Sequence, residues 1–217
     1  MNAPDSIADC IGASTLMVML PGALMRPEHM VDAGMFQAVR ERGLDLDLLA
    51  VNLHALGGCN RQALDHLRDE VLAPARKRYD KVWLAGISRG GQLVLSSLAE
   101  HAAPVDGVCL LAPYPGSRLT TNRIRQAGGL EVWQPSEREL EDPEFRLWRW
   151  LRQPDFRGPV FLGYGAHDRF ADGMQLLVRQ LPDATFLEVD GVHDWLAWMP
   201  LWSMFLDEGY FEPEART

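Results

Sequence analysis

The sequence predicts an α/β fold, with a doubly wound and mostly parallel sheet of about six strands and helices on both faces. Short apolar runs alternate with segments of helical periodicity about six times, which is typical of βαβ units. The composition agrees, since 47% of the 217 residues are apolar and 24% are charged, as in ordinary globular proteins. A chain of this length builds one core, so we expect a single domain over residues 1–217.

The expected strands are apolar runs bounded by glycine, proline or polar turn residues. They cover residues 15–20, 44–51, 82–85, 105–112, 159–164 and 184–189. Residues 1–13 contain no such run and are expected to form a loose leader. In a parallel sheet ligands bind beyond the carboxyl ends of the strands, so the loops after these strands are expected to hold the site.

The segments between the strands carry apolar side chains on one helical face. Pro27 is well placed to begin the first helix, which is expected to end near Gly43, and the second helix is expected to end or kink near Pro74. The apolar faces are formed by Val31, Met35 and Val39, by Leu64, Leu67, Val71 and Leu72, by residues 93–99, by Met174, Leu177, Val178 and Leu181, and by Trp198, Met199, Trp202, Phe205 and Leu206.

Charge and hydropathy exclude several classes of protein. The net charge of −9 leaves no basic stripe to neutralise phosphates, so we expect no nucleic-acid partner. The longest apolar stretches, such as Leu16–Leu20 and Val108–Ala112, are far too short to cross a bilayer, so we expect no membrane partner. The N-terminus carries Asp5 and Asp9 and no basic region, which argues against a signal peptide.

The cysteines give no sign of a disulfide framework or a zinc site, because Cys10, Cys59 and Cys109 are widely spaced and odd in number. Each is expected to be a small buried hydrophobic residue. A reducing, cytoplasmic location fits this pattern best.

The segment that carries chemistry is Gly86–Gly90, which reads Gly-Ile-Ser-Arg-Gly and lies between the strand 82–85 and the helix over 93–99. A strand that turns sharply into a helix presents its turn residue at the sheet edge, and the flanking glycines let the backbones pass closely. The helix N-terminus behind Ser88 favours developing negative charge. We therefore interpret Ser88 as a nucleophile; a capping serine in a tight turn is the alternative.

Two residues further along the chain are suited to activate this serine. A serine hydroxyl is a poor nucleophile unless a base removes its proton. His193 lies in the short loop between the last strand and the last helix, where such a base belongs. Asp168 follows the strand 159–164 and is the expected acid that orients the histidine.

Other residues could fill the same roles. His54 follows the second strand and is another candidate for the base. Asp172 begins a helix, where capping explains it, and Asp194 adjoins His193 too closely in sequence to bind its ring easily. The pairs His167–Asp168 and His193–Asp194 could suggest a metal site, but no metal-ligand spacing supports one, so no metal is expected.

Four segments together resemble the α/β-hydrolase superfamily, over roughly residues 14–208. L-A-G-I-S-R-G-G at 84–91 resembles its nucleophile elbow, and L-P-G-A at 20–23 resembles the loop that supplies half of the oxyanion hole. G-Y-G-A-H-D-R-F at 163–170 resembles the acid loop, and V-D-G-V-H-D-W at 189–195 resembles the histidine loop of the esterase D and enterochelin esterase branch. The resemblance implies a minimal version of the fold, without the two strands that usually come first.

The resemblance also implies an activity, the hydrolysis of a small carboxylic ester through an acyl-enzyme, with no cofactor. In this reading Ser88, His193 and Asp168 form the triad, and the backbone N–H groups of Ala23 and Arg89 hold the oxyanion. The alternatives are a thioesterase or acyltransferase with the same triad, and a catalytically silent ligand-binding domain of the same fold.

Residues 117–157 break the alternation, because they are polar and contain no strand candidate. A plain crossover helix between two parallel strands is one reading, but it needs only about fifteen residues. The glycine pair at 128–129 allows a hinge, and tryptophan offers a large apolar contact. We expect a short helical lid over Ser88, with Leu24, Trp133 and Trp148 lining the substrate pocket.

Overall fold

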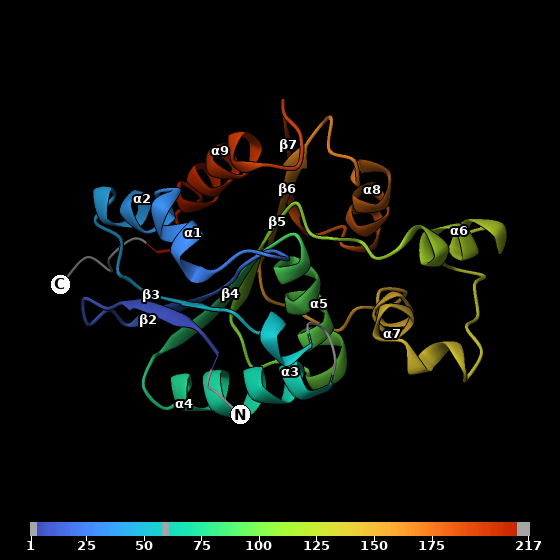
Figure 1. The fold of residues 1–217 in the computed structure, drawn as a ribbon, viewed down its shortest axis with the longest axis horizontal. Helices are drawn as coiled ribbons and strands as arrows, with labels where there is room; N and C mark the ends of the chain where they lie inside the picture. Colours follow the sequence, from blue (N-terminus) through green and yellow to red (C-terminus); the bar gives the residue numbers. More distant parts are fainter. Residues whose placement is uncertain (1–3, 58–60, 212–217) are drawn as a thin grey trace.

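The computed structural model describes residues 4–57 and 61–211, and its strands form one twisted sheet (Figure 1). Cys109 is buried as expected, whereas Cys10 is exposed, so that part of the expectation is wrong. Cys59 lies outside the described residues, so its expected burial stays a prediction. The strands are β1 (Ser6–Asp9), β2 (Thr15–Leu20), β3 (Leu46–Val51), β4 (Lys81–Ile87), β5 (Gly107–Leu111), β6 (Val160–Gly165) and β7 (Thr185–Val189). Their order across the sheet is β1-β3-β2-β4-β5-β6-β7, and all pairs are parallel except β1 with β3. The predicted α/β fold class is therefore confirmed.

The described part of the sheet has seven strands rather than about six, because the N-terminal residues form one more. Ser6 pairs with Val51 and Asp9 with Leu48 in an antiparallel ladder. The expectation of a loose leader over residues 1–13 is thus wrong where the structure describes it, and one strand does precede β2. Four residues that alternate in burial give too short a pattern to indicate a strand by themselves.

A buried carboxylate explains why this N-terminal segment is ordered. Asp47 in β3 is 0% exposed, and its Oδ1 accepts the backbone N–H groups of Ile11, Gly12 and Ala13 at 2.7, 3.1 and 3.1 Å. Its Oδ2 accepts the hydroxyl of Tyr79 at 2.9 Å. Burial alone raises the pKa of Asp47, but these hydrogen bonds outweigh it and lower the pKa below its ordinary value. A charged Asp47 therefore ties the leader to the sheet.

The helices follow the expected order with two local changes. They are α1 (Pro27–Asp32), α2 (Met35–Glu41), α3 (Arg61–His66), α4 (Ala73–Ala75), α5 (Arg89–His101), α6 (Arg118–Gln126), α7 (Pro143–Trp150), α8 (Ala171–Gln180) and α9 (Trp195–Leu206), with 3-10 helices η1 (His54–Leu56) and η3 (Glu139–Glu141) and a π-helical stretch η2 (Leu67–Leu72). The expected first helix is divided into α1 and α2 at Gly34, whose φ of +89° is left-handed. The π-helical stretch lies directly before Pro74, where a kink was expected.

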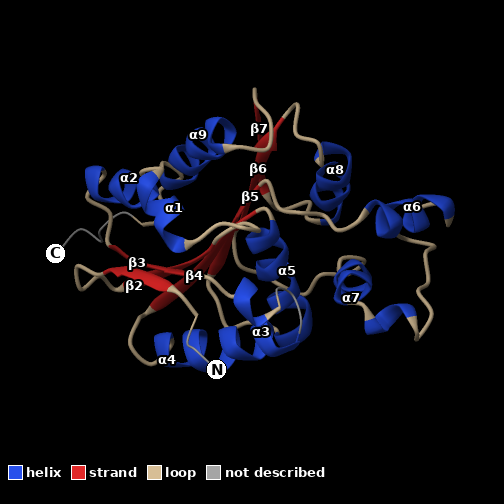
Figure 2. Cartoon of the chain, viewed as in Figure 1, coloured by secondary structure: helices blue, strands red, loops and turns tan. Residues whose placement is uncertain are grey.

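Helices cover both faces of the sheet (Figure 2). α1, α2 and α9 lie on one side, α3, α4 and α5 lie on the other, and α8 faces α9 across β6 and β7 (Figure 1). The central strand β4 is buried at every position except Lys81. No helix in the described ranges is long and apolar enough to span a bilayer.

An aromatic cluster closes the end of β4 that is remote from Ser88. The ring of Trp83 lies 4.9 Å from that of Tyr210, 5.0 Å from that of Phe211 and 5.8 Å from that of Phe205. Gly107 on β5 makes room for the indole, because a Cβ there would lie 2.4 Å from its ring carbons. The segment that follows α9 thus completes the core beneath the central strand.

We expect Asp47→Asn to lower the free energy of unfolding by about 2 kcal/mol at neutral pH, because the hydrogen bonds lose their charged acceptor. Since the pKa is lowered in the folded protein, this contribution is present above the ordinary pKa of about 3.9 and is lost as the pH falls through the folded value. Urea denaturation of both proteins from about pH 7 to about pH 3 measures the difference, which should shrink at the acid end.

Asp45→Asn is the matched control. Asp45 accepts the hydroxyl of Ser14, directly after the leader, at 2.6 Å, but this contact is at the surface, so a change within about 0.5 kcal/mol is expected. Equal losses in the two variants, or a loss that does not depend on pH, would contradict the role of Asp47.

Candidate active site

Ser88 joins β4 to α5 in a conformation that few residues adopt. Its φ of +52° and ψ of −114° lie outside the ordinary allowed regions, and such strain persists only where the surroundings enforce it. Here the backbone is held in this conformation by close contacts at two glycines. A Cβ on Gly90 would lie 2.0 Å from the carbonyl oxygen of Leu20, and one on Gly86 would lie 2.5 Å from the carbonyl carbon of Gly90. α5 therefore begins in backbone contact with the sheet, and the turn lifts Ser88 to its edge.

The structure brings Ser88, His193 and Asp168 together from three separate loops. His193 Nε2 lies 2.8 Å from Ser88 Oγ, and His193 Nδ1 lies 2.5 Å from Asp168 Oδ2. The side chain of Asp168 is 0% exposed, and its other oxygen accepts the backbone N–H of Phe170 at 2.8 Å. A carboxylate on Nδ1 holds the proton there and leaves Nε2 free to accept the serine proton. The arrangement can thus deprotonate Ser88.

Two aromatic rings fix the plane of the imidazole. Phe170 meets the His193 ring at 5.1 Å and 86°, and Trp198 meets it at 5.2 Å and 87°. Edge-to-face contacts of this kind are favourable and exclude water from the sides of the ring. Sequence reasoning missed both residues as parts of the site. Their closeness in sequence to Asp168 and His193 is the one signal that could have found them.

The alternative candidates make other contacts. His54 Nε2 lies 2.8 Å from the carbonyl oxygen of Pro21, so it supports the loop after β2 and does not contact the serine. Asp194 caps α9 by accepting the N–H of Leu196 at 3.0 Å. His167 is 72% exposed at its side chain and faces solvent near Asp190.

The loop after β2 passes beside Ser88. A Cβ on Gly22 would lie 3.5 Å from the Cβ of Ser88, so residues 21–23 border the site. Arg89 is the first residue of α5, and N–H groups in the first turn of a helix have no acceptor within the helix. The use of the Ala23 and Arg89 amides as oxyanion donors stays a prediction.

Comparison with known proteins identifies the fold. No protein-family model and no curated protein matches the sequence. Among solved structures, Est1E from Butyrivibrio proteoclasticus has a TM-score of 0.68 and 13% identity, with 93% of each chain covered. S-formylglutathione hydrolase FrmB from Staphylococcus aureus has a TM-score of 0.60 and 15% identity, over 90% of this chain and 80% of that one. FphF, a fluorophosphonate-binding serine hydrolase of Staphylococcus aureus, has a TM-score of 0.62 and 12% identity, over 95% of this chain and 98% of that one.

The chain has the α/β-hydrolase fold. In this α/β-hydrolase fold the serine, acid and histidine loops follow β4, β6 and β7, which all end at one edge of the sheet. The fold predicted from the four sequence segments is therefore confirmed.

The insertion at 117–157 is largely helical, and Glu144 ties it to the turn at Ser88. Glu144 Oε2 accepts the N–H of Ser117 at 2.8 Å and the hydroxyl of Thr120 at 3.1 Å, while Oε1 lies 3.6 Å from the Arg89 guanidinium. Arg89 in turn stacks over the ring of Tyr114 at 5.2 Å. Burial, together with the Glu144 carboxylate, raises the pKa of Tyr114, so its hydroxyl stays protonated at neutral pH.

The expected pocket residues do not gather around Ser88. Leu24 has a left-handed φ of +61° and is 99% exposed, so it encloses no pocket. Trp133 is buried against Phe145 at 5.7 Å, inside the insertion. Trp148 is buried too, with its indole N–H donating to the carbonyl of Pro115 at 2.8 Å, and it borders a cavity of about 390 Å³ between α6 and α8. Both tryptophans pack within the insertion. A sequence pattern does not distinguish a tryptophan that packs in this way from one that lines a pocket.

α7 occupies the place of a crossover helix, because it packs along α5. α6 lies farther out, beside α8 (Figure 1). Whether the insertion acts as a lid over Ser88 stays a prediction.

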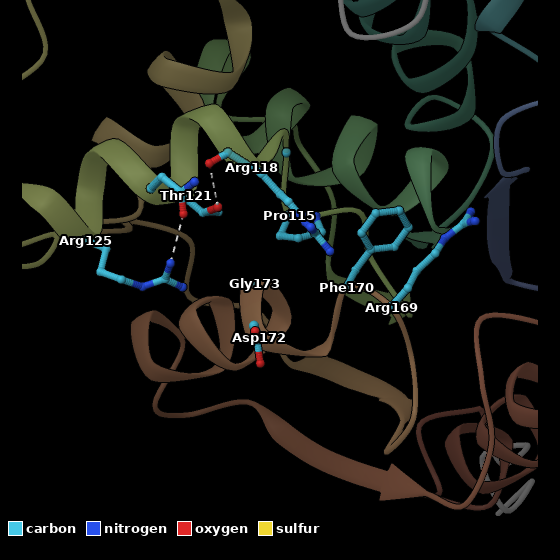
Figure 3. Close-up of a pocket in the computed structure, with 10 residues that line it drawn as sticks. Pro115, Arg118, Thr121, Arg125, Arg169, Phe170, Asp172 and Gly173 are labelled. Carbon is cyan, nitrogen blue, oxygen red and sulfur yellow. Dashed lines mark hydrogen bonds between the residues drawn. The ribbon is translucent and has the colours of Figure 1, made fainter.

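A cavity of about 340 Å³ does lie beside the loop that holds Asp168, between α6 and the start of α8 (Figure 3). Phe170 forms part of its wall and touches His193 with the same ring. The described residues that line it are Pro115, Gly116, Arg118, Thr121, Asn122, Arg125, Arg169, Phe170, Asp172 and Gly173.

We expect Glu144→Gln to lower the free energy of unfolding by about 1–2 kcal/mol, because the Ser117 and Thr120 donors lose a charged acceptor. Glu141→Gln on the neighbouring 3-10 helix is the control. Glu141 is exposed, so a change within about 0.5 kcal/mol is expected. Urea denaturation, monitored by tryptophan fluorescence, measures the stability of both variants. Equal stability of the two would contradict the role of Glu144 in holding the insertion to the turn at Ser88.

Proposed function

We propose that the protein is a serine hydrolase that cleaves a small carboxylic ester through an acyl-enzyme intermediate. The observation that carries the proposal is the position of His193, 2.8 Å from the Ser88 hydroxyl and 2.5 Å from the Asp168 carboxylate. The strained turn at Ser88 adds support, since such strain is typical of functional sites. The fold shared with FphF and Est1E is consistent with it.

The first half of the reaction forms the acyl-enzyme. Ser88 Oγ attacks the carbonyl carbon of the ester while its proton passes to His193 Nε2. The carbonyl electrons move onto oxygen, where the amides of Arg89 and Ala23 are the proposed donors. The bond to the leaving alcohol then breaks, and His193 returns its proton to that alcohol.

The second half releases the acid. His193 removes a proton from water, and the hydroxide attacks the acyl carbonyl. The bond to Ser88 Oγ breaks, and His193 gives the proton back to the serine. Asp168 stays ionised throughout and stabilises the imidazolium that forms twice in the cycle.

We expect Ser88→Ala to lose about 10³-fold or more in turnover of p-nitrophenyl esters, because no other group in the proposed mechanism attacks the carbonyl. A fluorophosphonate probe should label the wild type and not the variant. The substrate screen runs through acyl lengths and includes acyl thioesters, which pass through the same steps. Folded wild-type protein that takes no label would favour a silent ligand-binding domain, and a variant with more than about a tenth of the activity would contradict the nucleophile.

We expect Asp168→Asn to depress turnover by up to about 10⁴-fold, because an amide on Nδ1 stabilises the wrong tautomer of His193. Asp194→Asn is the control, since Asp194 caps α9 and has no contact with the imidazole nitrogens; it should lose about 1 kcal/mol of stability at most and keep its turnover. Steady-state kinetics and thermal unfolding of both variants measure this. A crippling effect of Asp194→Asn with a mild effect of Asp168→Asn would reverse the assignment of the acid.

A further inference from the structure

The cavity beside Phe170 is rich in positive charge, although the chain as a whole carries a net charge of −9. Arg118 and Arg125 reach it from α6, and Arg169 comes from the loop that holds the acid Asp168. In Figure 3 the side chains of α6 and the ring of Phe170 border this hollow, whereas the Arg169 side chain extends along the Phe170 ring on the side away from α6. The concentration of guanidinium groups at one place in an acidic protein needs a reason.

The spacing in α6 places these side chains on one face of the helix. Arg118, Thr121, Asn122 and Arg125 are separated by three, one and three residues, so all four lie along one side. All four line the cavity. Arg123 is not in this row; it forms an ion pair with Glu139 of the insertion. The cavity side of α6 therefore differs from its other side in having arginines without acidic partners.

Within residues 4–57 and 61–211, none of the three cavity arginines forms an ion pair. Arg125 donates to Asn122 Oδ1 at 2.9 Å, and Arg169 stacks on the ring of Phe170 at 4.8 Å. Asp172 is the single acid in the lining, and in the view of Figure 3 its carboxylate points away from α6. Positive charge thus remains in excess in the cavity.

The cavity is built into the packing of the fold. Gly173 in α8 lies against Pro115, since a Cβ there would come within 2.5 Å of the proline ring. On the opposite wall Glu144 holds Ser117 and Thr120 at the start of α6. Both walls are therefore fixed without a ligand, and a volume of about 340 Å³ suits a small polar group and its attached chain.

The cavity lies next to the proposed reaction centre. Phe170 separates the two, and its ring contacts both the cavity and the His193 imidazole, at 5.1 Å between ring centres. The Phe170 ring is thus shared by the wall of the cavity and the surroundings of His193.

We propose that this cavity binds an anionic group, a carboxylate or a phosphate, carried by the ester substrate. Guanidinium groups bind such oxyanions through paired, charge-assisted hydrogen bonds. The anion site stands on its own lining, while the statement that its ligand is an ester rests on the proposed function.

Two matched pairs of esters test the preference. Mono-p-nitrophenyl glutarate against p-nitrophenyl pentanoate places the charge on the acyl part, and 4-acetoxybenzoate against its methyl ester places it on the leaving group. We expect the anionic member of at least one pair to have a kcat/KM about tenfold higher, and the ratio to fall in high salt. Arg118→Gln and Arg125→Gln should each reduce that ratio several-fold. Arg123→Gln is the matched control, because it removes the same charge from α6 outside the cavity, and it should keep the wild-type ratio.

A binding measurement separates this proposal from the proposed function. Calorimetry with glutarate, and separately with inorganic phosphate, is carried out on Ser88→Ala, alone and combined with each arginine change. We expect binding of at least one anion that Arg118→Gln and Arg125→Gln weaken about tenfold and Arg123→Gln does not. If no ester is cleaved but this pattern holds, the anion site stands and the ester hydrolysis fails. If esters are cleaved without an anionic preference and neither anion binds, or if Arg123→Gln has the same effect as the others, the anion site is overturned.

Discussion

The site depends on one backbone contact, the approach of α5 to β2 and β4 at Gly90 and Gly86. Any side chain on Gly90 would overlap the carbonyl of Leu20, so only hydrogen allows the helix to begin where it does. That position forces the strained backbone conformation of Ser88 and places the first turn of α5, whose N–H groups have no acceptor within the helix, directly after it. The loop after β5 is held by the same turn, since the N–H of Tyr114 donates to the Ser88 carbonyl at 2.8 Å. Because β5, β6 and β7 run parallel to β4, the loops that follow them converge there as well.

The features that the sequence predicts well are local ones. The six parallel strands, the turn at Ser88 and the positions of Asp168 and His193 each follow from a run of a few residues and its neighbours. The misses involve contacts between distant segments. β1 depends on Asp47, which lies in another strand, and Trp133 looks like a ligand contact until Phe145 is seen to cover it. The cavity lined by arginines forms between α6 and the loop that follows Asp168. The hydrophobic periodicity of each segment does not show that the two segments are neighbours in the fold.

The insertion is linked to the turn at Ser88 through Glu144. Glu144 holds the first turn of α6 on one side and lies beside Arg89, the residue after Ser88, on the other. The same helix that carries the cavity arginines is thus anchored to the turn that presents the hydroxyl. An ion pair that is only 15% exposed at its carboxylate is screened little by salt, so this anchor is expected to hold under varied conditions.

The aromatic cluster beneath β4 has a consequence for how the protein is made. Trp83 is synthesised long before Phe205, Tyr210 and Phe211, whose rings cover it in the finished fold. During translation the strand that leads to the serine therefore has a large apolar side chain open to water and to other chains. Contacts between residues so far apart in sequence form late and slowly. The central strand acquires its full cover only when the segment after α9 has left the ribosome, so this fold is completed after synthesis of the loops that hold Ser88, Asp168 and His193 rather than alongside them.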